Sequence, residues 1–275
     1  MRHRRLPLVP LSVALAVALG AACGADPGPA AHGPGRPGPD RAAPAAAPVV
    51  EVRREGGSVD TPVVLPDVLV MADGRLLSEG AVPAIYPGPL LPSVLEQRIG
   101  ATGVERIVER ARRAGLLRDV RYAGPSDDRT EPAIPTVVTL RVGGRSYVHR
   151  VIGLAYGEAD PARARLERFL RSLDDLGQRP PYPTAFAPAR YLVAARPAAD
   201  DPPDFAPGAP TRPTVVDWPA ATGVRLADAG TCAAVPAAAV RDALDGADQI
   251  TLFRDGGVVY SVSPVPQVPG TGCGG

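Results

Sequence analysis

The chain has 275 residues, of which 45% are hydrophobic, and this is enough for one or two modest domains. The formal net charge is +1, from 30 basic and 29 acidic residues, which argues against a dedicated nucleic-acid-binding protein. The sequence contains no lysine, which excludes a Walker A phosphate loop, a Schiff base and the S-x-x-K acyl-transfer motif.

The first 22 residues have the layout of a secretory signal peptide. Three arginines precede an apolar run over residues 6–19, which at about 14 residues is too short for a spanning helix of about 20. Two cleavage sites fit this leader. A general signal peptidase would cut after Ala18. Alternatively, residues 19–23 resemble the lipobox of bacterial lipoproteins, in which Cys23 would be acylated and become the first mature residue; Gly20 stands where that motif prefers leucine.

The cysteine count bears on this choice. The chain has three cysteines, Cys23, Cys232 and Cys273, and an exported protein with an odd cysteine keeps a free thiol in an oxidising compartment. If Cys23 is acylated, Cys232 and Cys273 are free to pair. The alternative is that all three are incidental and that Cys23 is removed or remains free. We predict lipidation at Cys23 and a disulfide between Cys232 and Cys273.

Residues 23–60 begin with a proline-, alanine- and glycine-rich tract, for which we predict a disordered membrane tether. Residues 61–197 are predicted to form an α+β domain. Asp73 and Gly74 lie between two apolar runs, which is a strong hairpin signal. Residues 102–115 read as a helix with a capping box at Thr102 and Glu105.

A second hairpin is predicted around Gly143 and Gly144, with a register that pairs Val138 with His149. Residues 160–177 form the other predicted helix, with Asp160 as its cap. Its buried stripe contains Leu166, Phe169, Leu170 and Leu173. Its arginines are predicted to lie largely off that stripe: Arg163, Arg165, Arg168 and Arg171.

Residues 198–275 are predicted to form a C-terminal lobe closed by the disulfide. They include a strand near 214–218, a helix over 236–244 and a third hairpin near 255–257, whose register the sequence leaves open. The whole therefore predicts an α+β fold, an antiparallel sheet built from hairpins with helices packed on one face.

Catalytic and metal-binding patterns are sparse. His149 shares a sheet face with apolar residues, so we interpret it as structural, and Ser126 as a turn residue. We predict no catalytic residue and no cofactor. We also predict no metal site, because the cysteine and histidine clusters that bind zinc are missing from the sequence. The acidic loops are interpreted as solvated and not as calcium sites: Asp127, Asp128 and Glu131, and Asp200, Asp201 and Asp204. Asp174 and Asp175 face different directions and do not form a glycosidase pair.

Three features could serve in binding. The arginine-rich face of the 160–177 helix fits an anionic wall polymer or lipid headgroup, although a solvated face is the simpler reading. Residues 85–92 and 180–186 carry prolines and aromatic side chains, and we favour loops that cover a sheet edge over a docking ledge. Trp218 is expected in the core or against the disulfide.

The leader, the tether, residues 71–76, residues 85–92 and the spaced pair Cys232 and Cys273 together resemble the uncharacterised lipoproteins of actinobacteria. That group carries no assigned activity, so the resemblance implies only the lipidated Cys23 and the disulfide. We therefore expect a lipid-anchored protein on the outer face of the plasma membrane, which binds a wall polymer or an envelope protein and no nucleic acid. The alternative is a secreted cell-wall-active hydrolase that uses loop carboxylates.

Overall fold

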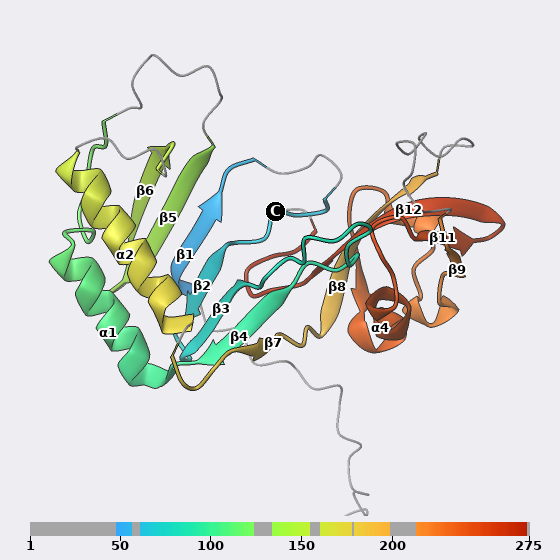
Figure 1. Cartoon of the computed structure of the whole chain (residues 1–275), viewed down its shortest axis with the longest axis horizontal. Coiled ribbons are helices and arrows are strands. Elements are labelled where there is room, and N and C mark those ends of the chain that lie inside the picture. The colour runs from blue at the N-terminus through green and yellow to red at the C-terminus, as the bar shows by residue number, and fades with distance from the viewer. Residues whose placement is uncertain are drawn as a thin grey trace, which may run out of the picture. The chain divides into compact units, whose positions relative to one another are not determined.

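The computed structural model describes residues 48–56, 61–123, 134–154, 160–177, 179–198 and 213–273. These residues form two β-sheets with helices, and the predicted α+β class is confirmed (Figure 1). The predicted leader lies outside the described residues.

The first sheet has seven strands in the order β6-β5-β1-β2-β3-β4-β7, and every neighbouring pair is antiparallel. The strands are β1 (Pro48–Arg54), β2 (Val68–Met71), β3 (Arg75–Glu79), β4 (Val94–Arg98), β5 (Pro135–Val142), β6 (Arg145–Ile152) and β7 (Thr184–Ala185). Two helices, α1 (Gly100–Arg113) and α2 (Pro161–Gly177), lie side by side over one face of this sheet (Figure 1). That face and the two helices share one core, to which Val70, Leu140 and Leu166 belong.

The position of β1 corrects the predicted tether. Residues 48–54 were expected within it, but they form a strand that pairs with both β2 and β5 in the interior of the sheet. The reason is burial: Val50 and Val52 enter the core under the helices, where they are 1% and 4% exposed. A β-branched run beside a proline-rich tract is therefore a strand when two neighbours complete its hydrogen bonds.

The two hairpins predicted in this sheet are confirmed. The turn between β2 and β3 contains Gly74, whose φ is +86° and whose missing side chain leaves room for Gly100. In the β5–β6 hairpin, Val142 pairs with Arg145 and Val138 pairs with His149, as predicted.

Both predicted helices are present, and one predicted cap is wrong. The helix α1 begins at Gly100, two residues before the predicted start, and its N-cap residue Ile99 makes no side-chain capping bond. Thr102 and Glu105 therefore lie inside the helix and form no capping box at its end. The other cap is confirmed, because Asp160 Oδ1 accepts a hydrogen bond of 2.8 Å from the backbone N–H of Ala162 at the start of α2.

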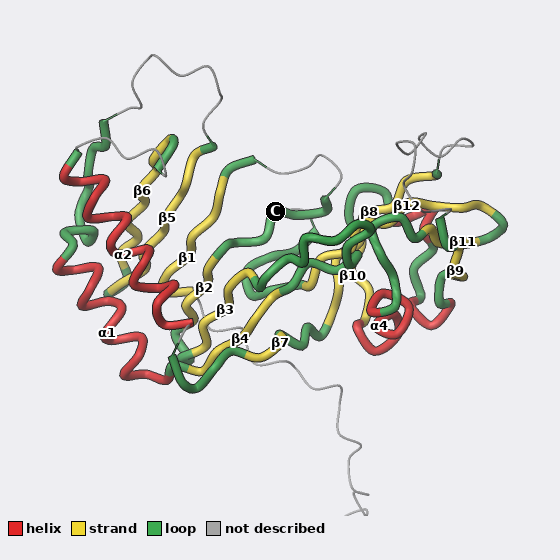
Figure 2. The backbone as a smooth tube through the Cα atoms, in the orientation of Figure 1, coloured by secondary structure: helices red, strands yellow, loops and turns green. Residues whose placement is uncertain are grey.

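The second sheet has five strands in the order β10-β8-β12-β11-β9 (Figure 2). They are β8 (Arg190–Pro197), β9 (Val215–Asp217), β10 (Ala233–Pro236), β11 (Leu252–Asp255) and β12 (Val258–Pro266). The helical segments η1 (Ala220–Thr222), α3 (Leu226–Ala229) and α4 (Ala237–Asp245) belong to this part of the chain. The β11–β12 hairpin pairs Asp255 with Val258, which settles the register that the sequence left open.

One strand of the second sheet comes from before residue 198. The strand β8 was grouped with the preceding residues, but it lies between the C-terminal strands β10 and β12 and pairs with both. The division into domains at residues 197 and 198 stays a prediction. The pairing of β9 with β11 is parallel, and it joins residues that are far apart in the sequence.

Candidate functional site

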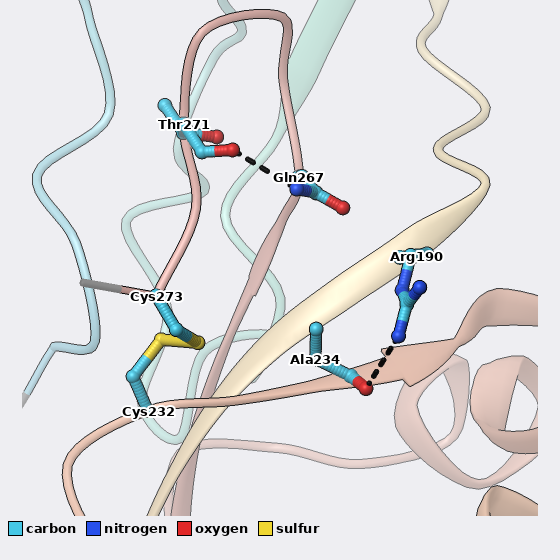
Figure 3. Close-up of a disulfide and its surroundings, with 6 residues drawn as sticks. All are labelled: Arg190, Cys232, Ala234, Gln267, Thr271 and Cys273. Carbon is cyan, nitrogen blue, oxygen red and sulfur yellow. Dashed lines mark hydrogen bonds between the residues drawn. A yellow bond between two sulfur atoms is a disulfide. The ribbon is translucent and has the colours of Figure 1, made fainter. Parts of the chain in front are cut away.

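The disulfide predicted from the cysteine count is present. Cys232 and Cys273 are bonded, with their Cα atoms 5.4 Å apart. Cys232 directly precedes β10, and Cys273 ends a turn after β12 in which Gln267 Nε2 donates to the carbonyl of Thr271 at 2.9 Å (Figure 3). The bond therefore fastens the C-terminal turn to the edge strand of the second sheet. Cys23 lies outside the described residues.

His149 is buried in the first sheet, in keeping with its expected place among apolar residues. Its side chain is 1% exposed. Nε2 lies 2.8 Å from the carbonyl oxygen of Leu116, so this nitrogen carries the proton, and Nδ1 accepts a hydrogen bond of 2.9 Å from the hydroxyl of Tyr122. Burial lowers the pKa of His149, although the Leu116 carbonyl and the charge of Asp119 oppose this. Burial also raises the pKa of Tyr122 to about 12. Both ring nitrogens are occupied, so this imidazole is not placed to act as a base.

Arg163 does not lie off the helix stripe as expected. It is 1% exposed, and its guanidinium donates to the carbonyls of Ala123, Ile152 and Gly153 at 2.8, 3.0 and 2.6 Å. The buried guanidinium therefore joins α2 to three carbonyls that lie outside this helix. The helical spacing of α2 gave no sign of this requirement, because the three carbonyls belong to other parts of the chain.

Two other arginines of α2 lie close to arginines of α1. A groove of about 470 Å³ between the two helices is lined by four arginines and three other residues, here called the arginine groove: Arg110, Arg113, Ala114, Arg165, Arg168, Phe169 and Ser172. Arg110 Nη1 donates to the carbonyl of Ser172 at 3.0 Å, which holds its guanidinium against α2. The prediction that the α2 face could bind anions named Arg165 and Arg168 but missed their partners. The missed signal is that both helices carry arginines three residues apart, which places each pair on one face.

A larger groove, of about 840 Å³, lies where residues 61–67 and 79–94 approach β12. Its lining is mostly valine, leucine and proline, and Val64 and Val82 are 43% and 68% exposed. At one end Arg54 binds both carboxylates of the lining, at 3.0 Å to Asp67 and 3.2 Å to Glu79. These contacts raise the pKa of Arg54, with the hydrogen bond to Asp67 as the largest cause.

Both proline-bearing segments pack partly on the sheets, while Ile85, Tyr86 and Tyr182 are exposed. Leu90 and Leu91, from residues 85–92, pack on the core of the second sheet. From residues 180–186, β7 pairs with the edge of β4, and Phe186 packs against the face of the first sheet opposite the helices. Trp218 lies in the second core as expected: it is 7% exposed and contacts Phe253 edge to face, with ring centroids 5.6 Å apart.

Comparison with known proteins gives no further guide. No family model, no curated protein sequence and no solved structure matches this chain.

A metal site and a membrane-spanning helix each place their own requirements on the described residues. The described part of the chain contains no group of three or more His, Cys, Asp and Glu side chains that could hold a metal ion. The two acidic loops considered for calcium, and Ser126, lie outside the described residues. Within those residues, no helix is long and apolar enough to cross a membrane.

Asp174 has a raised pKa, because burial disfavours its charge and Asp175 and Asp67 repel it. It lines neither groove.

Proposed function

We propose that the protein is an extracytoplasmic lipoprotein, held on the outer face of the plasma membrane by acyl chains on Cys23, and that it acts by binding a component of the cell envelope. The observation that supports this most is the disulfide between Cys232 and Cys273. Stable disulfides belong to oxidising compartments, so the bond fits an exported protein. Of the three cysteines in the sequence, this bond uses two and leaves Cys23, which follows the predicted leader, for acylation.

Acylation explains the odd cysteine and the compartment together. Two acyl chains give stable membrane attachment, whereas one chain gives only marginal attachment. The proline-rich residues after Cys23 would then separate the folded part from the bilayer.

The described grooves favour binding over catalysis. Asp67 and Glu79, the carboxylates of the larger groove, are both engaged by Arg54. His149 is buried with both nitrogens bonded. Neither arrangement offers a free acid or base to a substrate. The alternative, a hydrolase that uses loop carboxylates, would draw on the two acidic loops that lie outside the described residues.

The anchor is tested by replacing its sulfur. In a bacterium that exports and acylates lipoproteins, Cys23→Ser should move the protein from the membrane fraction to the culture fluid or leave it with an uncleaved leader. Mass spectrometry of the wild-type N-terminal peptide should find Cys23 as the first residue, carrying acyl chains. The matched control is the double variant Cys232→Ser/Cys273→Ser, which removes the disulfide and should remain in the membrane fraction. A wild-type protein that is recovered without acyl chains, with its N-terminus beyond residue 23, contradicts the proposal.

A further inference from the structure

We propose that the arginine groove between α1 and α2 binds a phosphate group carried by a soluble or polymeric organic molecule. The phosphate ligand would be the envelope component of the proposed function. The inference rests on that function only for the place where the protein meets its ligand, outside the plasma membrane. The binding itself can be measured on protein without acyl chains.

Few negatively charged side chains lie near the arginines of the groove. Four of its seven lining residues are arginine, and no carboxylate lines it. Arg113 lies 3.8 Å from Glu109, a loose contact between side chains that are 70% and 47% exposed. Arg165 and Arg168 have no ion pair with any described residue. Like charges held together repel, so an anion between them removes an unfavourable interaction that the empty groove retains.

The helix ends do not account for this clustering. Arg110 and Arg113 lie in the last turn of α1, where cations complement the helix dipole. The last turn of α2 contains no basic residue, and Arg165 and Arg168 lie in its first half. The helix dipole therefore explains the pair on α1 but does not explain Arg165 and Arg168, which face the same groove.

The geometry suits an oxyanion with several oxygens. The contact between Arg110 and the carbonyl of Ser172 uses one of five N–H donors, so the guanidinium is positioned while most of its donors stay available. Arginine forks match the oxygen spacing of phosphate and can bond it in a bidentate manner. Ala114 and Phe169 form an apolar part of the groove lining, against which the organic part of a phosphate ester can pack.

A bilayer surface fits this site less well than a discrete phosphate. Proteins that lie on anionic membranes combine basic residues with apolar side chains that insert among the lipids. None of the large apolar side chains found exposed in the described chain belongs to α1 or α2. The four arginines also lie together in one groove between two helices.

The test is calorimetric titration of the mature Cys23→Ser protein with pyrophosphate at low salt. Saturable binding is expected. The variant Arg113→Gln/Arg168→Gln removes one charge from each helix in the groove and should weaken binding about tenfold or more, the loss expected for charge-assisted hydrogen bonds. The control Arg106→Gln/Arg171→Gln removes one charge from each of the same helices outside the groove, and should change the affinity less than about twofold. All four residues are exposed, so circular dichroism should find every variant folded.

Four results would overturn the proposal, three from titrations and one from vesicle binding. The first is a lack of saturable binding by the wild-type protein. The second is an equal loss of affinity in the groove variant and the control, which would reveal a response to net charge alone. The third is citrate binding as tightly as pyrophosphate, which would show that the site reads charge and not phosphate. Vesicles of phosphatidylglycerol should bind no better than vesicles of phosphatidylcholine, and strong phosphatidylglycerol binding that needs Arg113 and Arg168 would overturn the assignment to a soluble or polymeric ligand. None of these measurements depends on acylation of Cys23, so they separate failure of this proposal from failure of the anchor.

Discussion

Removing the disulfide should destabilise the second sheet by an amount that follows from the loop it closes. Cys232 and Cys273 are 41 residues apart, and in the chain-entropy model such a cross-link contributes about 4 kcal/mol by restricting the unfolded chain. With a urea dependence of about 2–3 kcal/mol per molar, the unfolding midpoint should fall by about 1.3–2 M. We expect this fall in Cys232→Ser/Cys273→Ser, measured in the Cys23→Ser background so that acyl chains play no part.

The assay can use the chain's single tryptophan. Trp218 is 7% exposed and packs in the core of the second sheet, so its fluorescence reports on the unfolding of that core. The Cys23→Ser protein treated with a reducing agent should unfold at the same urea concentration as the double variant, because both lack the same cross-link. An unchanged midpoint in the double variant, with the disulfide verified by mass spectrometry in its parent, would refute the reasoning.

Two further predictions concern the first sheet. Burial lowers the pKa of His149, so the imidazole of the unfolded chain takes up a proton at a higher pH than that of the folded protein. The contribution of His149 to the free energy of unfolding is therefore complete above about pH 6.5, and it is lost as the pH falls toward the folded-state pKa. Urea unfolding from pH 7 to pH 5 should therefore give a shallower loss of stability in His149→Gln than in the parent, and equal slopes would count against the burial argument. Gly74→Ala should cost at least about 2 kcal/mol, because φ is +86° and the new Cβ would lie 2.6 Å from the Cα of Gly100. The control Gly143→Ala has φ of +58° and open space around the new Cβ, so it should cost only about 1 kcal/mol, and similar thermal unfolding midpoints for the two variants would contradict this difference.

The sequence predicted best where interactions are local. A two-residue glycine turn fixes which residues face each other in a hairpin, and the pairing of Val138 with His149 followed from Gly143 and Gly144 alone. The spacing of Leu166, Phe169 and Leu173 likewise gave the buried side of α2. Cap geometry was less predictable. Asp160 caps α2, but Thr102 lies inside α1, because that helix begins at Gly100. There the backbone N–H groups of Ile99 and Gly100 donate to the carbonyl of Gly74, a residue distant in the sequence.

The candidate site could be predicted only in part. The sequence placed Arg165 and Arg168 on a helix face, and the cysteine count paired Cys232 with Cys273. The convergence of these arginines with Arg110 and Arg113 depends on how two helices pack over one sheet, which no spacing within either helix determines. The burial of Arg163 could not be predicted for the same reason, because the carbonyls that accept its hydrogen bonds lie outside its own helix.

What the sequence determined by itself was the existence of hairpins, helices and a disulfide, because turns, helical periodicity and cysteine parity act within short or countable sets of residues. Only the tertiary structure decided that residues 48–54 form an interior strand, that β8 joins the C-terminal strands and that four arginines share one groove. These outcomes depend on which distant segments complete each other's hydrogen bonds and bury each other's apolar faces, and that choice is a property of the whole folded chain.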